Sequence, residues 1–313
     1  LSIMAPAPPI SPPPPDRSLW WLGMILMVGS TVAGAIGGLF IRKSHLIASR
    51  HARLSWAYWL VGIFVVQLFL NVGMSMAALA FAAQSLLSPL IACQIVFNAF
   101  LAPCFLAGET LTVRDGVGTA FIVAGCVAAG LFAPHSDPHY SLQVLLDDYT
   151  RPAFLAYAAT CAALMAGAYL GSLQRRWQSL QRVGAAALPG ALVGNANIFA
   201  KAASGLLVGA VAHGDWSPFA KSPLPYVVMV VAPLMAGLSL LFLNRALAAW
   251  PATSIVPTYI STLVVVSTVS GGLCFGEFAS LSASHALGLA CGVLLVVAGV
   301  TVQASGARPK AGG

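Results

Sequence analysis

A single lysine inside a long apolar run is the residue of this sequence best placed to act on a solute. Lys201 is the only ionisable residue near the centre of such a run, and Asn197 precedes it by one helical turn. A period of 3.6 residues places both on the face that carries Gly190, Gly194 and Gly205. Because polar groups are costly inside a membrane, this face points into a helix bundle. There it could bind or gate a solute, or it could serve helix packing while Lys201 donates to a carbonyl group.

Uncharged polar residues recur at helical spacing in three other apolar runs. They are Gln67, Asn71 and Ser75 in the first, Gln94 and Asn98 in the second, and Ser254, Thr258, Tyr259, Ser261 and Thr268 in the third. Together these side chains could surround a small polar or hydrated solute, although each taken singly suits an interhelical hydrogen bond equally well. We therefore predict a substrate path lined by Lys201, Asn197, Asn71, Gln94, Asn98, Tyr259, Thr258 and Ser261.

The acidic residues all lie outside the centres of the apolar runs. Glu109 and Glu277 end two of the runs, where they could attract cations at the mouths of a path or cap helices. With Lys201 as the one internal charge, electrostatics alone favours an anionic or zwitterionic solute. The sequence contains no P-loop, no nucleophile elbow and no metal-ligand spacing. We therefore expect neither ATP-driven transport nor an enzyme, and we expect no cofactor.

The composition indicates what kind of protein must position these residues. Of the 313 residues, 59% are hydrophobic and 7% are charged, whereas a soluble domain carries roughly 25% charged residues. So few charges exclude a soluble enzyme, a disordered regulator and a nucleic-acid-binding domain. A membrane span needs about 20 mostly apolar residues, and nine runs qualify, at about 18–41, 56–82, 86–107, 113–133, 152–173, 184–212, 224–247, 252–275 and 284–304. The sequence predicts an all-α polytopic membrane protein, with eight spans as the alternative because the break between the second and third runs is weak.

The distribution of lysine and arginine predicts the orientation, since cytosolic loops are enriched in both. If all nine runs cross, eleven of these residues lie on one side and three on the other, with Lys201 on neither. This places the N-terminus outside or in a lumen and the C-terminus in the cytosol, in a membrane that the sequence does not identify. Apolar spacing within Tyr140–Tyr149 also predicts a short amphipathic helix on the outer membrane surface.

The chain also contains a weak internal repeat. A shift of 168 residues aligns Pro89 with Pro257 and Gly108-Glu109 with Gly276-Glu277, and six further residues align Ala124-Gly125 with Ala298-Gly299. The copies lie five spans apart, and an odd offset inverts one copy across the membrane. Inverted repeats are typical of secondary transporters, whose binding site lies near the midplane between the halves. The predicted organisation is a Pro-rich tail at 1–17, a first repeat of four spans at 18–133, an outer loop with the interfacial helix at 134–151, a linking span at 152–173, a basic cytosolic loop at 174–183, a second repeat of four spans at 184–304 and a cytosolic tail at 305–313.

An ordered set of short motifs resembles the NIPA-type magnesium transporters, a branch of the drug/metabolite transporter superfamily. The set runs through residues 20–304 and includes AFAAQSLLSPL at 80–90, GETL at 108–111, LNRAL at 243–247 and SIVPTY at 254–259. The Ala200-Lys201 pair and residues 271–278 are similar to the NIPA-like proteins of this branch. The resemblance implies nine spans and transport of Mg²⁺ as the substrate. Magnesium-transporting members tend to carry an acid in the second span, where this chain reads NVGMS at 71–75.

These observations favour a secondary transporter for Mg²⁺ or another divalent cation. One alternative is an organic-anion or metabolite exchanger of the same superfamily, in which Lys201 is the counter-ion of a carboxylate or phosphate. A second alternative is a structural membrane subunit that does not transport, whose Pro-rich tail docks a partner. The expected partners are a small ion or solute and the lipid bilayer but no nucleic acid, and a homodimer is compatible with the sequence.

Overall fold

The computed structural model describes residues 19–47, 51–105, 112–135, 142–173, 178–250 and 252–305. The described residues form helices and contain no strand. Nine helical segments among them are long and apolar enough to cross a membrane. The predicted tail at 1–17 and Glu109 lie outside the described residues.

The nine segments lie where hydropathy predicted them, which confirms nine spans rather than eight. They are α1 (Trp20–Ile47); α2 (Ala52–Leu60), η1 (Val61–Val72) and α3 (Gly73–Phe81) in succession; α4 (Gln84–Leu90) with α5 (Cys93–Phe105); α6 (Val113–Phe132); α8 (Pro152–Leu173); α9 (Gln178–His213); α11 (Leu224–Ala249); α12 (Ala252–Cys274); and α13 (Ala283–Ser305). The break between the second and third spans is a turn at Ala82 and Ala83, whose ψ angles of 160° and 138° leave the helical region.

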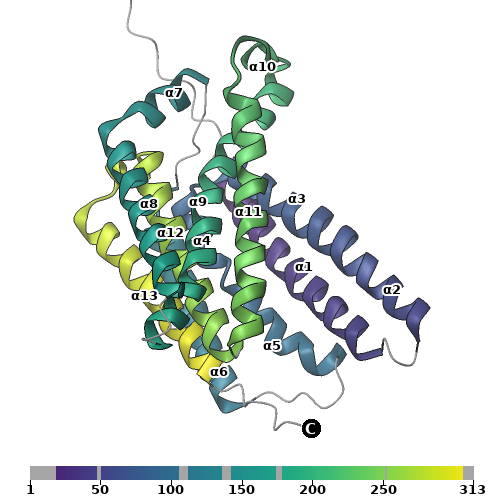
Figure 1. Cartoon of the computed structure of the whole chain (residues 1–313). Helices are drawn as coiled ribbons and strands as arrows, with labels where there is room; N and C mark the ends of the chain where they lie inside the picture. Colours follow the sequence, from purple (N-terminus) through teal and green to yellow (C-terminus); the bar gives the residue numbers. More distant parts are fainter. Residues whose placement is uncertain are drawn as a thin grey trace, which may run out of the picture.

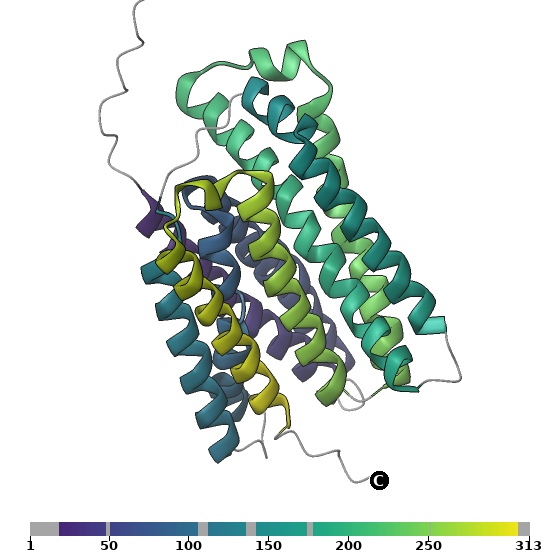
Figure 2. The same ribbon diagram turned by 90° about the vertical axis from the view of Figure 1, so that its left-hand side faces the viewer.

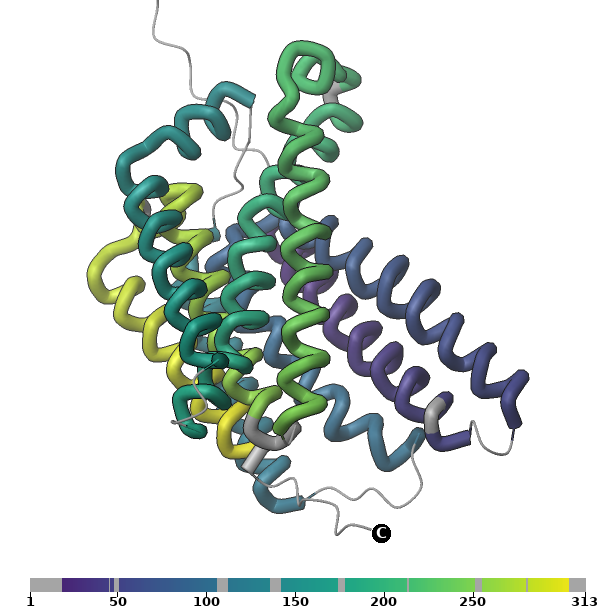
Figure 3. Tube along the Cα trace, in the orientation of Figure 1, coloured from purple at the N-terminus to yellow at the C-terminus, as the bar shows by residue number. Residues whose placement is uncertain are grey.

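The two halves of the chain use the same pattern of neighbours. In the first half α1 packs against η1, α3 and α5, and in the second half α9 packs against α11 and α12. Figures 1 and 3 show α1 running side by side with the second span, at a slant to α9 and α11. The linking helix α8 lies against α9. This correspondence agrees with the repeat that the sequence predicts.

The contact between α6 and α13 joins the last spans of the two halves along their length (Figure 2). A Cβ atom added at Gly118 would lie 2.8 Å from the carbonyl oxygen of Gly299, and one at Gly125 would lie 2.6 Å from that of Gly292. At an offset of 174 residues, which is 168 plus the six of the longer loop, Gly118 is equivalent to Gly292 and Gly125 to Gly299. Each glycine therefore contacts the equivalent of the other, as in a two-fold symmetric interface. The helices approach through backbone alone, and their pairing supports an inverted repeat.

Between the spans, the described residues include three short helices. They are α7 (Leu142–Thr150), α10 (Ser217–Lys221) and η2 (Glu277–Ser280), and α7 and α10 lie at the same end of the bundle in Figure 1. The predicted amphipathic helix thus exists as α7, but part of its apolar side faces protein instead of lipid. Leu145 is fully buried and packs against Ala202, Ala203, Leu206 and Val228, while Leu146 stays 43% exposed. An apolar stripe that suits a membrane surface suits the end of α9 as well, and sequence spacing cannot separate the two.

Candidate functional site: a buried ion pair between the repeats

The N-terminus of α4 is capped by a carboxylate from the other half of the chain. The backbone N–H of Gln84 donates to Glu277 Oε1 at 2.7 Å, and the N–H of Ser85 donates to Glu277 Oε2 at 2.8 Å. The first N–H groups of a helix have no partner within it, and a negative charge there is also favoured by the helix dipole. Glu277 is only 5% exposed. The end of the eighth span is therefore fastened to the start of the third.

A glycine in the left-handed region turns Glu277 back into the protein. Helix α12 ends at Cys274, and Gly276 has a φ of 64° immediately before Glu277. This conformation costs other L-residues roughly 1–2 kcal/mol, whereas glycine adopts it freely. In the second copy of the aligned Gly-Glu pair, the glycine is thus required by the turn that directs the glutamate into the protein.

We expect Gly276→Ala to lower the free energy of unfolding by about 1 kcal/mol and to impair transport, because the new side chain opposes the turn that places Glu277. Gly214 is a matched control, since its φ is 66° and a Cβ atom there meets nothing within 4 Å. Gly214→Ala should cost similar stability and leave transport intact. Equal loss of transport in both variants, measured in liposomes, would show that backbone strain rather than the position of Glu277 matters.

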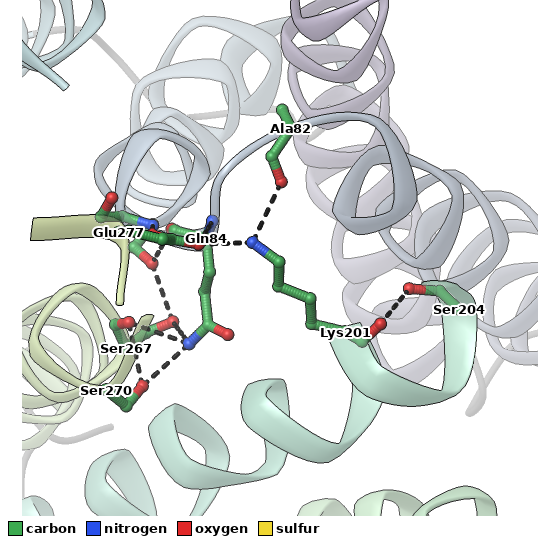
Figure 4. Close-up of polar contacts among 9 residues, drawn as sticks. Ala82, Gln84, Lys201, Ser204, Ser267, Ser270 and Glu277 are labelled. Carbon is green, nitrogen blue, oxygen red and sulfur yellow. Dashed lines mark hydrogen bonds and ion pairs between the residues drawn. The ribbon is translucent and has the colours of Figure 1, made fainter. Parts of the chain in front are cut away.

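Lys201 of α9 completes the site from a third direction. Its side chain is fully buried, and its Nζ forms an ion pair with Glu277 Oε1. The same Nζ lies 3.4 Å from the carbonyl oxygen of Ala82 and 5.0 Å from the centre of the Phe275 ring. Figure 4 shows the ammonium between the α3–α4 turn and Glu277. A buried ammonium without a partner would be very costly, so each member of the pair accounts for the burial of the other.

A network of uncharged groups extends from this pair between α4 and α12. Gln84 Nε2 donates to the backbone oxygen of Ser267 at 2.9 Å and to Ser270 Oγ at 2.8 Å. Ser267 Oγ lies 2.8 Å from Ser88 Oγ and accepts from Asn197 Nδ2 at 3.0 Å. Within the described part of the chain, the buried Gln84 Oε1 has no hydrogen-bond partner. The network therefore joins both repeats and still contains one unsatisfied amide oxygen.

Two of the remaining predicted path residues form a separate cluster in the first half. A Cβ atom at Gly34 of α1 would lie 3.0 Å from Asn71 Nδ2 and 2.9 Å from Gln94 Nε2. Asn71 Nδ2 also donates to Gln67 Oε1 at 2.9 Å. This cluster lies on the π-helical segment η1, on α1 and on α5. The structure thus brings Asn71 and Gln94 together, but around Gly34 rather than at the ion pair.

The other predicted residues occupy different positions. Tyr259 presents its backbone oxygen to Gly190 of α9, and Thr258 accepts from Thr262 through its backbone. Ser261 Oγ is buried without a partner among the described residues, and Asn98 is exposed. Of the predicted set, Lys201, Asn197 and Glu277 therefore share one network. Five further residues belong to it that no sequence pattern indicated, namely Gln84, Ser85, Ser88, Ser267 and Ser270.

The structure corrects the expectation of an unbalanced positive charge inside the bundle. Glu277, which the sequence places at a mouth of the path, is buried and paired with Lys201, so the two charges cancel. Hydropathy placed Glu277 correctly at the end of a span but did not show that Gly276 returns it to the protein. The available signal was the Gly-Glu pair aligned in both repeats, together with a lysine that needed a counter-ion.

Nine apolar helices in the described residues, with a charged polar network where the two halves of the chain meet, are typical of a multi-pass membrane protein of the secondary-transporter type. The family model of the magnesium transporter NIPA matches residues 22–306. The chain belongs to this family, which comprises transporters rather than enzymes.

Several relatives are similar over most of the chain. Magnesium transporter NIPA3 of Pongo abelii is 24% identical over 296 residues, which cover 90% of this chain and 69% of the relative. Probable magnesium transporter NIPA8 of Arabidopsis thaliana is 29% identical, with coverage of 79% and 57%, and NIPA6 of the same plant is 25% identical, with coverage of 90% and 86%. No solved structure is significantly similar to the chain.

Proposed function

We propose that this protein carries Mg²⁺ across a membrane by secondary transport. The observation that carries the proposal is the match of the magnesium transporter family to residues 22–306, which includes all nine spans except the first two residues of α1. The structure removes the electrostatic objection to a cation, because Glu277 neutralises Lys201. Carboxylate, amide, hydroxyl and carbonyl oxygens are also the ligands that Mg²⁺ prefers.

The architecture supports alternating access, in which the two halves rock about a site between them. The contact of Glu277 and Lys201 with residues 82–85 holds the halves together at one end of the bundle. We infer that this contact closes the gate at that end. By the distribution of lysine and arginine, this end faces the outside or a lumen, and the C-terminus faces the cytosol.

The metabolite-exchanger alternative depended on Lys201 as the counter-ion of an anionic substrate. Lys201 already has a counter-ion within the chain, so its charge no longer argues for an anionic substrate. The match of the magnesium transporter family then favours the cation. The structural-subunit alternative has no observation in its favour, since polar groups of both halves meet in one network.

Transport by purified protein in liposomes tests the proposal. With a Mg²⁺-sensitive dye inside and a Mg²⁺ gradient imposed, we expect saturable uptake that protein-free liposomes lack. Asp147→Asn removes an exposed acid of α7 and should leave uptake unchanged. Folded and inserted protein that takes up phosphate or a carboxylate but no Mg²⁺ would contradict the proposal.

A further inference from the structure

The surroundings of the Lys201 ammonium are those of a cation-binding site. Its Nζ is in contact with a carboxylate oxygen of Glu277 and a backbone oxygen of Ala82, and it faces the ring of Phe275. Nothing in this set is specific to a lysine, because oxygen atoms and the face of an aromatic ring attract any small cation. The site is fully enclosed, since Lys201 is 0% exposed.

A further oxygen atom of the same turn has no partner. Gln84 Oε1 is buried, and no described residue donates to it. Figure 4 shows the amide oxygen of Gln84 pointing away from Ser267 and Ser270, on the side where Lys201 lies. A buried acceptor without a donor costs free energy, and native structures contain few of them. The Gln84 amide oxygen is therefore a candidate ligand that the ammonium leaves unused.

We propose that the Lys201 ammonium is a tethered cation that occupies the binding site of the transported ion in the state seen here. A divalent cation displaces it and binds the Glu277 carboxylate, the Ala82 carbonyl oxygen and the Gln84 amide oxygen. This inference rests on the proposed function, since it names the site of the same ion. It extends that function, because the Lys201 ammonium fills the site whenever no divalent ion is bound.

Electrostatics makes the two cations exclusive. A divalent ion on Glu277 Oε1 would lie in contact with the present position of Nζ, where repulsion in a poorly screened interior is strong. The four-carbon stem of lysine is flexible, so the ammonium can turn away from Glu277 when the divalent ion binds. The divalent ion and the Lys201 ammonium then compete for the same oxygen atoms, so removal of the ammonium must raise the affinity for the divalent ion.

The test is Mg²⁺ binding to purified protein in detergent, followed by its unfolding temperature at constant ionic strength. We expect Lys201→Met to be less stable than the parent without Mg²⁺ and to be restored by Mg²⁺ in a saturable way. Its half-saturating concentration should be at least about tenfold lower than that of the parent, because a site filled by its own lysine for about nine-tenths of the time binds tenfold more weakly. Asp147→Asn is the control and should behave as the parent does.

The variant with both Lys201→Met and Glu277→Gln decides the question even where Lys201→Met alone cannot be purified. It holds no charge at positions 201 and 277, so it should fold, and we expect it to lose the saturable response to Mg²⁺. An unchanged response in the double variant, or a response of Lys201→Met equal to that of the parent, would overturn the inference.

Two results distinguish a wrong site from a wrong function. If parent liposomes take up Mg²⁺ and the double variant has an unchanged KM, the proposed function holds but the proposed site is wrong. Tight Mg²⁺ binding by Lys201→Met, without Mg²⁺ uptake by parent liposomes, would support the site and remove the function.

Discussion

Glu277→Gln should lower the free energy of unfolding by about 3–5 kcal/mol, because it leaves the Lys201 ammonium buried without a counter-ion. The glutamine amide adds a second problem, since its NH₂ group would face the backbone N–H of Gln84 or Ser85. Chemical unfolding of the detergent-solubilised protein, followed by tryptophan fluorescence, measures the loss. Transport should fall with it, because the cap on α4 and the contact between the halves both depend on this carboxylate.

The double variant Lys201→Met with Glu277→Gln separates charge from geometry. A neutral pair of similar volume should recover most of the lost stability, since replacing a whole buried ion pair is far less costly than breaking it. Should the double variant be as unstable as the single one, the two N–H groups of α4 rather than the charge would explain the effect.

Gly125→Ala should destabilise the protein by about 1–3 kcal/mol, through overpacking between α6 and α13. The added Cβ atom would lie 2.6 Å from the backbone oxygen of Gly292 and 2.7 Å from the backbone nitrogen of Val296. Backbone atoms cannot move aside as a side chain can, so the two helices must separate. The same unfolding measurement detects the change, and Gly292→Ala should give a similar loss.

Gly130→Ala is the matched control on the same helix. There the nearest atom to the added Cβ is Met24 Cε at 3.6 Å, which is an ordinary contact with a flexible side chain. We expect stability to be unchanged or slightly increased, because alanine favours helix over glycine by up to about 1 kcal/mol. An equal loss in both variants would refute close packing as the cause.

The spans could be predicted from sequence because length and hydropathy decide them locally. The end of the fourth predicted run at 133 and the observed end of α6 at Phe132 differ by one residue. The repeat was also visible, since Pro89 and Pro257 align and the helix neighbours of the two halves correspond. Composition and spacing therefore sufficed for the spans, and the relation between the halves stays a prediction that the helix neighbours support.

The site could be predicted only in part because it depends on contacts between distant residues. Lys201 was recognised from its cost inside a membrane, but its partner Glu277 lies 76 residues away at the end of another span. Asn71 and Asn197 are both asparagines within apolar runs, so the sequence does not distinguish them. In the folded chain Asn71 lies beside Gly34, whereas Asn197 donates to Ser267. No spacing rule within one helix contains that information.

The reciprocal glycine contact between α6 and α13 bears on how such a chain could arise. The two halves contribute equivalent glycines to this contact, so both halves use the same surface. A chain of half the length, inserted into a membrane in both orientations, would meet an inverted copy of itself through this same surface. The covalent link through α8 would then only fix the ratio and orientation of two units that were already able to pair.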